Sequence, residues 1–92
     1  MTEVHLSGLL VCADTDQASV VVDHLEQHIR LTRAEDGCLS FEVRATEDPL
    51  IWAVEERFRD AAVFAAHQAR VAASEWGRVT AGVERRYEIT GV

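Results

Sequence analysis

The sequence predicts an α+β domain whose elements follow the order β-α-β-β-α-β. Residues 18–29 carry apolar side chains at helical spacing, whereas residues 38–45 alternate apolar and polar side chains, as a half-buried strand does. Asp48-Pro49 then marks a turn, and a second strand pattern follows it. A helix leading into a hairpin is the centre of this order.

The first predicted strand covers residues 4–12, where apolar side chains lie on both faces in imperfect alternation. Asp14 can cap the helix that follows, and Gln17, three residues later, stands in the position of a capping box. The apolar stripe of this helix is formed by Ala18, Val21, Val22, Leu25 and Ile29.

Residues 38–45 and 51–58 are expected to pair as a hairpin. The core side of the first of these strands would hold Leu39, Phe41 and Val43, and that of the second Trp52, Val54 and Phe58.

Asp60 can cap a second helix that extends to about Arg70 and carries Phe64 and His67 three residues apart on one face. A short extra turn is expected to end at Trp76-Gly77.

Residues 83–90 complete the set as a fourth strand with Val83, Arg85, Tyr87 and Ile89 on one side. Right-handed crossovers and a short hairpin connect these elements most economically as a ferredoxin-like antiparallel sheet in the order 4-1-3-2, with both helices on one face. The chain of 92 residues is expected to form one domain, 1–92.

The other face of the sheet would be bare and apolar at its centre. It would carry Ser7, Leu9, Val11 and Ala53, joined by Val54 or Ile89 depending on the register. A domain of this size is expected to cover such a face, so we predict a homodimer in which two sheets pack together as a dimeric α/β barrel.

Composition argues against several kinds of partner. The net charge is −7 and no run of Lys or Arg exceeds two residues, so neither nucleic acid nor an anionic membrane is an expected partner. The N-terminal residues lack the basic-then-apolar pattern of a signal peptide, and no apolar run approaches the roughly 20 residues of a membrane span. We therefore expect a cytoplasmic protein.

The two cysteines are expected to be free thiols. Cys12 would end the first strand and Cys38 would begin the second, with another strand between them, and a disulfide requires Cα atoms within about 7 Å. Their spacing also matches no zinc motif.

A series of short motifs resembles one family over nearly the whole chain. They are His28-x-x-x-Thr32-Arg33-Ala34-Glu35-x-Gly37-Cys38-Leu39-Ser40-Phe41-Glu42, Asp48-Pro49, Glu55-x-x-Phe58 and Phe64-x-x-His67. In order and spacing they are similar to the antibiotic biosynthesis monooxygenase (ABM) domain family. The resemblance implies a dimeric α/β barrel. Members of this family include cofactor-independent monooxygenases of quinols and polycyclic aromatics, haem-degrading enzymes, and proteins without an assigned substrate.

In the cofactor-independent members the electron-rich substrate anion itself reacts with O₂, so the protein deprotonates, orients and desolvates it. The partners implied are a small aromatic substrate and O₂, with no metal and no cofactor. His67 stands at the helix position that supplies the iron ligand in haem-degrading members. However, the chain contains no Asn and Phe58 lies near where a Trp is expected, so haem degradation is disfavoured.

The candidate catalytic residues are His67, as base or orienting group, and Tyr87, whose hydroxyl can donate to a phenolate. The candidate substrate pocket is formed by His28, Trp52, Phe58, Phe64 and Trp76. Each of these side chains has a purely structural alternative, as a buried histidine with a backbone partner or as an aromatic core residue. Arg33 and Glu35 are interpreted as structural residues of the helix-to-strand turn. Cross-strand or interface ion pairs are expected among Glu42, Glu55, Glu56, Arg57, Arg85 and Arg86.

Two functions therefore compete. The first is a cofactor-independent monooxygenase of a quinol or phenolic aromatic, and the alternative is a non-catalytic dimeric barrel that binds a small molecule or serves a stress-related role. Polar groups converging on a cavity of roughly 300 Å³ or more with His67 in its wall would favour an enzyme or a metabolite binder. A fully packed interior would favour a structural role.

Overall fold

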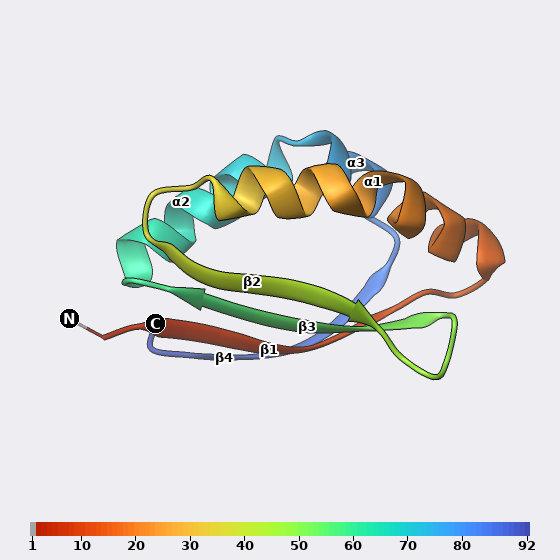
Figure 1. Cartoon of the computed structure of the whole chain (residues 1–92), viewed down its shortest axis with the longest axis horizontal. Coiled ribbons are helices and arrows are strands. Elements are labelled where there is room, and N and C mark those ends of the chain that lie inside the picture. The colour runs from red at the N-terminus through yellow and green to blue at the C-terminus, as the bar shows by residue number, and fades with distance from the viewer. Residues whose placement is uncertain (1) are drawn as a thin grey trace.

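A computed structural model describes residues 2–92 and has one four-stranded antiparallel sheet with its helices on one face (Figure 1). The elements, in chain order, are β1 (Val4–Val11), α1 (Thr15–Arg33), β2 (Cys38–Ala45), β3 (Ile51–Phe58), α2 (Ala61–Ala72), α3 (Glu75–Val79) and β4 (Glu84–Thr90). The sheet order is β2-β3-β1-β4, which is the predicted order read from the other edge. The ferredoxin-like fold is confirmed.

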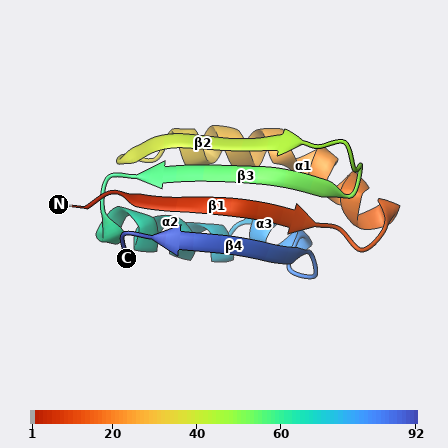
Figure 2. The same ribbon diagram turned by 90° about the horizontal axis from the view of Figure 1, so that it is seen from below.

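Viewed from below, the sheet presents a face that no helix of residues 2–92 covers (Figure 2). The register decides which side chains lie there. Val54 and Tyr87 both pair with Gly8, and Ile89 pairs with Leu6, so their side chains share the helix-covered face with Leu6. Neither Val54 nor Ile89 belongs to the bare face.

The helix starts follow the predicted caps. Asp14 Oδ1 accepts a hydrogen bond of 2.9 Å from the Gln17 amide, and Asp60 Oδ1 accepts one of the same length from Val63. The side chain of Gln17 forms a second capping hydrogen bond, in which its Oε1 accepts from the backbone amide of Ala13 at 2.8 Å. The predicted short turn is a five-residue helix, α3, that begins before Trp76-Gly77 rather than ending there.

The predicted apolar stripe of α1 is rotated relative to the buried one. Val21, His28 and Thr32 are buried, whereas Val22 is 60% exposed. Thr32 can be buried because its hydroxyl accepts a hydrogen bond from Arg70, and the His28 ring is buried by stacking on Trp76. The sequence pattern predicted that the most apolar stripe of α1 faces the core, but the protein buries this stripe only in part.

A β-bulge in β2 changes the predicted burial of one side chain, Leu39. The register between β2 and β3 shifts between Cys38 and Ser40, so Leu39 leaves the predicted core and is 49% exposed. Phe41 lies beyond the bulge and is fully buried, as predicted.

The rest of the core combines alternating side chains of the strands with three side chains of the helices. The strands and the residues next to them contribute Val4, Leu6, Leu10, Cys12, Val54, Phe58 and Val83, and the helices contribute Val21, Phe64 and Trp76. Cys12 and Cys38 are free thiols, and β3 lies between β1 and β2. None of the helices within residues 2–92 has both the length and the apolar character needed to cross a bilayer.

Candidate active site

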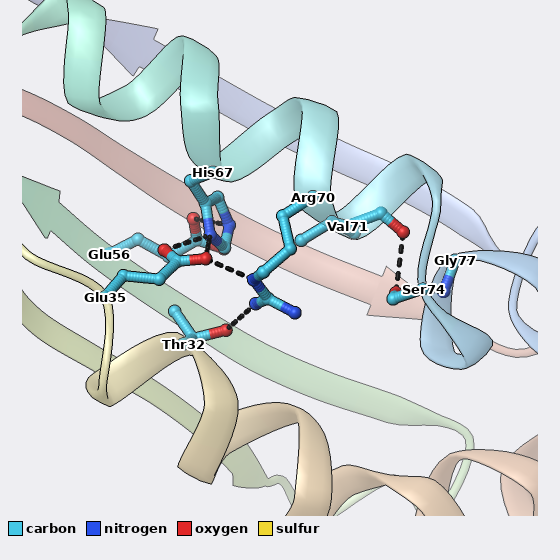
Figure 3. Close-up of polar contacts among 8 residues, drawn as sticks. All are labelled: Thr32, Glu35, Glu56, His67, Arg70, Val71, Ser74 and Gly77. Carbon is cyan, nitrogen blue, oxygen red and sulfur yellow. Dashed lines mark hydrogen bonds and ion pairs between the residues drawn. The ribbon is translucent and has the colours of Figure 1, made fainter.

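A buried histidine lies between the sheet and the helices, held by a carboxylate. His67, on α2, is 3% exposed, and its Nδ1 atom lies 2.8 Å from Oε1 and 3.2 Å from Oε2 of Glu35 (Figure 3). A carboxylate accepts hydrogen bonds, so Nδ1 carries the proton and donates it. The neutral ring then has its lone pair on Nε2, where it can act as a base.

Glu35, in the turn after α1, is itself held from α2. The Nε atom of Arg70 donates to Oε2 of Glu35, and another guanidinium nitrogen of Arg70 donates to Thr32 Oγ1 at 2.9 Å (Figure 3). Arg70 lies one helical turn after His67, so both residues of α2 face the end of α1. Glu35 therefore orients His67 through a network that ties α1 to α2.

A second carboxylate, Glu56 of β3, lies on the other side of the imidazole. Its Oε1 is 3.6 Å from His67 Nε2 and has no hydrogen-bond partner among residues 2–92. Burial, and then the charge of Glu35, raise the pKa of Glu56 to about 7, although Arg85 opposes the rise. Burial lowers the pKa of His67, against the opposing effect of Glu35. Near neutral pH the site can thus hold or release a proton.

These groups face a small, partly open cavity of about 50 Å³, whose lining includes the exposed residues Gln68 and Arg85. That is little more than the roughly 30 Å³ that one water molecule occupies in the liquid. Apolar side chains of β1, β2, β3 and α2 form much of its wall, and its polar lining residues are His28, Glu56, His67, Gln68, Arg85 and Tyr87.

His28 of α1 is the second histidine in this wall. It is 5% exposed and stacks on Trp76, with ring centroids 4.4 Å apart and planes 4° from parallel. Burial, and then the charges of His67, Arg70 and Arg85, together lower its pKa to about 3, so the ring is neutral at neutral pH. Its Nδ1 atom has no hydrogen-bond partner in the described part of the chain.

Tyr87 and Arg85 of β4 complete the polar wall. Burial raises the pKa of Tyr87 to about 12, so its hydroxyl keeps its proton at neutral pH. Arg85 is fixed by hydrogen bonds to the carbonyls of Thr80 and Val83, at 2.8 and 3.0 Å, and to Thr80 Oγ1 at 2.8 Å. A fixed cation therefore lies at this end of the cavity.

The predicted aromatic residues divide into two groups. Phe58 and Phe64 lie beside His67, with ring centroids 4.7 and 6.4 Å from its ring, and Trp76 lies against His28. Trp52 is elsewhere: it lines a surface groove with Val22, Leu25, Glu26, Ile29 and Arg33. The structure thus brings His28, Phe58, Phe64, His67, Trp76 and Tyr87 together but leaves Trp52 apart from the cavity.

Two open grooves adjoin the cavity from outside. One, of about 470 Å³, is lined by His67 together with Glu35, Asp36, Arg59, Ala62, Val63, Ala66 and Arg70. The other, of about 350 Å³, is lined by His24, Gln27, His28, Leu31, Arg70, Ala73, Ser74, Glu75 and Trp76. The size expected of a substrate pocket with His67 in its wall is therefore met by a surface groove and not by the cavity.

Four polar residues of this site were not assigned to it from the sequence. Glu56 and Arg85 were expected in cross-strand or interface ion pairs, but both line the cavity, and Glu56 is 6% exposed. Glu56 shares a strand face with Val54 and Phe58 at a spacing of two, so the alternation of the strand already indicated that Glu56 is buried. Glu35 and Arg70 meet across 35 residues, and nothing local in the sequence indicated that contact.

Within residues 2–92, no group of three or more His, Cys, Asp or Glu side chains is placed to hold a metal ion. The polar side chains of the cavity are instead a base between two carboxylates, a fixed cation and a neutral phenol.

The fold and this site define a class: small ferredoxin-like proteins with a polar site between the sheet and its helices. The model of the antibiotic biosynthesis monooxygenase family matches residues 11–78. The chain belongs to this family.

Solved structures share the fold at low sequence identity. A conserved protein from Bacteroides thetaiotaomicron, described as a possible oxidoreductase, superposes with a TM-score of 0.80 at 14% identity over 99% of this chain and 98% of its own. A protein from Nitrosomonas europaea described as a proposed antibiotic biosynthesis monooxygenase has a TM-score of 0.74 at 17% identity over 98% and 97%. A protein of the same description from Deinococcus radiodurans has a TM-score of 0.73 at 18% identity over 97% and 91%. No curated protein matches this chain at a significant level.

Proposed function

We propose that this protein is a monooxygenase that uses O₂ to oxygenate a quinol or phenolic aromatic, with no cofactor. The observation that carries the proposal is the alignment of Glu35, His67 and Glu56 at a small cavity between the sheet and the helices. Membership of the antibiotic biosynthesis monooxygenase family supports the same reaction class.

The first step is removal of a proton from a substrate hydroxyl by His67 Nε2. The imidazolium that forms lies between Glu35, bound to Nδ1, and Glu56, 3.6 Å from Nε2. Glu35 stabilises it, and Glu56 adds to this stabilisation in its ionised form, which predominates above about pH 7. The positive charge of Arg85 and the protonated hydroxyl of Tyr87 stabilise the phenolate.

The electron-rich anion then reacts with O₂. For a quinol, one oxygen atom becomes a new ring hydroxyl, the other leaves as water, and the substrate supplies all four electrons as it becomes a hydroxyquinone. The protein's own contribution is deprotonation, orientation and exclusion of water by the apolar walls.

The homodimer is part of this proposal, and the bare face of the sheet supports it through its charges. One row across the four strands places Glu42, Glu55, Ser7 and Glu88 side by side, and the next row places Arg44, Ala53, Leu9 and Arg86. In a twofold dimer, the acidic row of one copy can lie over the arginine row of the other. Attraction across the interface would then add to burial of the half-covered Leu9 and Ala53.

The size of the cavity favours a second candidate, a barrel that binds a small molecule without turnover. At about 50 Å³ the cavity holds no aromatic ring unless part of its wall moves. A binder could use the outer grooves alone, whereas an oxygenase must bring its substrate to His67 Nε2.

Oxygen uptake separates the two candidates. Metal-free protein is mixed with a panel of reduced quinols and anthrone-like phenols, and the wild type is compared with His67→Ala. Glu47→Gln is the control, because Glu47 is exposed in the loop between β2 and β3 and lines neither the cavity nor the grooves beside it. Uptake that requires His67 and survives Glu47→Gln supports the oxygenase, whereas binding of the same compounds with uptake at the buffer rate supports the binder.

A further inference from the structure

Two buried polar atoms belong to the wall of the small cavity and lack a partner. Nδ1 of His28 and Oε1 of Glu56 make no hydrogen bond within residues 2–92, and their residues are 5% and 6% exposed. Both residues line the cavity of about 50 Å³ beside His67. Burying such atoms unpaired is costly, so this site favours a ligand that can form hydrogen bonds with both.

A water molecule fits the size and the polarity of the cavity. The volume of about 50 Å³ exceeds the roughly 30 Å³ of one water molecule, and the cavity opens to solvent at Gln68 and Arg85. Nε2 of His67 lies 3.6 Å from Oε1 of Glu56 (Figure 3). That separation is too long for a direct hydrogen bond, and a bridging water can span it.

Building on the proposed function, we infer that a water molecule bound in this cavity joins His67 Nε2 to Glu56 Oε1 and is positioned by His28 Nδ1. Through this water, Glu56 receives the proton that His67 takes from the substrate and later returns it to the oxygen atom that leaves as water.

The transfer balances in both directions. His67 Nε2 donates its added proton to the bridging water, and the water donates one of its own protons to ionised Glu56, so Glu56 becomes a neutral carboxyl. When O₂ has added to a quinol anion, the O–O bond breaks and its electron pair leaves with the outer oxygen as hydroxide, which carries the hydrogen of the oxygenated ring carbon. The same relay, run in reverse, protonates this hydroxide to water and leaves Glu56 ionised.

The surroundings favour the proton on Glu56 over His67. Burial, and then the charge of Glu35, raise the pKa of Glu56 to about 7, whereas burial lowers the pKa of His67 below its usual 6.5. The titratable and charged groups that face Glu56 are Glu35 in the turn after α1, His28 of α1, Cys38 of β2, His67 of α2, and Arg85 and Tyr87 of β4. The proton therefore moves from the imidazolium to Glu56 with a favourable free energy.

The first test uses the resting protein without substrate. A neutral carboxyl has an infrared C=O stretching band that a carboxylate lacks, and we expect one that disappears as pH rises through about 7 and is absent from Glu56→Gln. His28→Phe keeps a ring beside Trp76 but removes Nδ1, so the water loses a partner and the band should move to higher frequency. His24→Phe, one turn earlier on α1 and outside the cavity wall, is the matched control and should leave the band in place.

The water itself can be detected by nuclear magnetic resonance. Val54 lines the cavity and is 2% exposed, so its methyl groups are shielded from bulk solvent. We expect magnetisation to pass from water to these methyl groups in the wild type and to do so less in His28→Phe.

The second test measures turnover across pH with a quinol that the wild type oxygenates. We expect Glu56→Gln to lower kcat at least about tenfold with KM unchanged, and Glu56→Asp to recover part of the loss, because a carboxyl can still take up the proton. Gln has the shape of Glu and Asp does not, so a purely structural role for Glu56 predicts the opposite order.

The relay and the oxygenase fail in different ways. If the infrared band titrates and responds to His28→Phe but no quinol consumes O₂, the water-linked pair is supported and the oxygenase is contradicted. If O₂ uptake requires His67 but Glu56→Gln turns over as fast as the wild type, the relay is wrong and the oxygenase stands. A band that responds equally to His28→Phe and His24→Phe, or no transfer from water to Val54, would also overturn the relay.

Discussion

The Nε2 atom of His67 lies 3.6 Å from Oε1 of Glu56, an oxygen to which no group within residues 2–92 donates a hydrogen bond. Because Nδ1 of the same ring is bound to Glu35, the imidazole lies between a carboxylate with several partners and one whose facing oxygen has none. The first carboxylate orients the ring. The second is available to a ligand, and its raised pKa makes it sensitive to pH near neutrality.

Glu56→Gln should change how stability depends on pH. The pKa of Glu56 rises from 4.5 to about 7 on folding, so the folded protein holds a proton that the unfolded chain has lost, and stability falls as pH rises through this window. Above about pH 7 the loss amounts to something on the order of 3 kcal/mol. Gln is neutral at every pH, so the variant should be more stable than the wild type at about pH 8.

His28 has the opposite effect on the pH dependence of stability, and its contribution must be separated from that of Glu56. Its pKa falls from 6.5 to about 3 on folding, so its contribution to stability is present above the unfolded value and is lost as pH falls through this range. Denaturant unfolding across pH should therefore show a shallow profile for the wild type and a steeper rise up to about pH 6.5 for Glu56→Gln. Glu47→Gln, at an exposed loop position, is the control. Parallel profiles for wild type and Glu56→Gln would contradict the burial of an ionisable Glu56.

Glu35→Gln should lower the pKa of His67 further. Glu35 contributes both charge and a hydrogen bond that raise this pKa against the effect of burial, and the amide keeps only a weaker hydrogen bond. Titration of the His67 ring carbons by nuclear magnetic resonance measures the shift. Asp36→Asn is the control, because the adjacent side chain is 95% exposed, and it should leave the titration of His67 unchanged. An equal shift in both variants would mean that Glu35 has no specific role.

Gly77→Ala should destabilise the protein by about 1–3 kcal/mol, through overpacking beneath α3. A Cβ at Gly77 would lie 2.1 Å from the backbone carbonyl oxygen of Val71, so the helix that carries Trp76 would have to move. Gly82→Ala is the matched control, since its Cβ would meet only the side-chain nitrogen Nε2 of Gln17, at 3.4 Å. Thermal unfolding compares the two variants, and equal melting temperatures would show that α3 is free to shift.

The charged rows of the bare face predict a specific dimer defect. Replacing Arg44 and Arg86 together with Glu would place acidic side chains opposite the acidic row of the partner, and we expect dimer affinity to fall at least about tenfold in sedimentation experiments. Adding Glu42→Arg and Glu88→Arg should restore it. Arg78→Glu is the control, because the side chain of Arg78 is exposed on α3, which lies on the opposite face of the sheet. A double variant that dimerises like the wild type, or a wild type that stays monomeric, would contradict this interface.

Regular patterns made the fold predictable. Alternation placed β2 and β3 at the same residues and β1 and β4 within one residue of their bounds. Asp14 and Asp60 located the helix starts because caps are local interactions. Leu39 and Val22 were placed wrongly because a bulge and the partners of His28 and Thr32 are tertiary features.

The site was less predictable for the same reason. His67, Tyr87 and His28 were chosen by residue type and family position, and they do line one cavity. Glu35 and Arg70 meet only once α1 and α2 lie on the same face of the sheet. The alternation of β3 places Glu56 on the buried face, but the charge of Glu35, which adds to the rise of its pKa, is brought near only by the tertiary fold.

The most direct test of the central claim is isotopic. Wild-type protein, His67→Ala and Glu56→Gln are each mixed with a reduced bicyclic quinol under oxygen-18 gas, and the product and the water are analysed by mass spectrometry. The account predicts one labelled oxygen atom in each hydroxyquinone and one in water, with the rate greatly reduced in His67→Ala and lowered in Glu56→Gln. Product formed at the same rate in all three proteins and in buffer alone would contradict the assignment of this cavity as an oxygenase site.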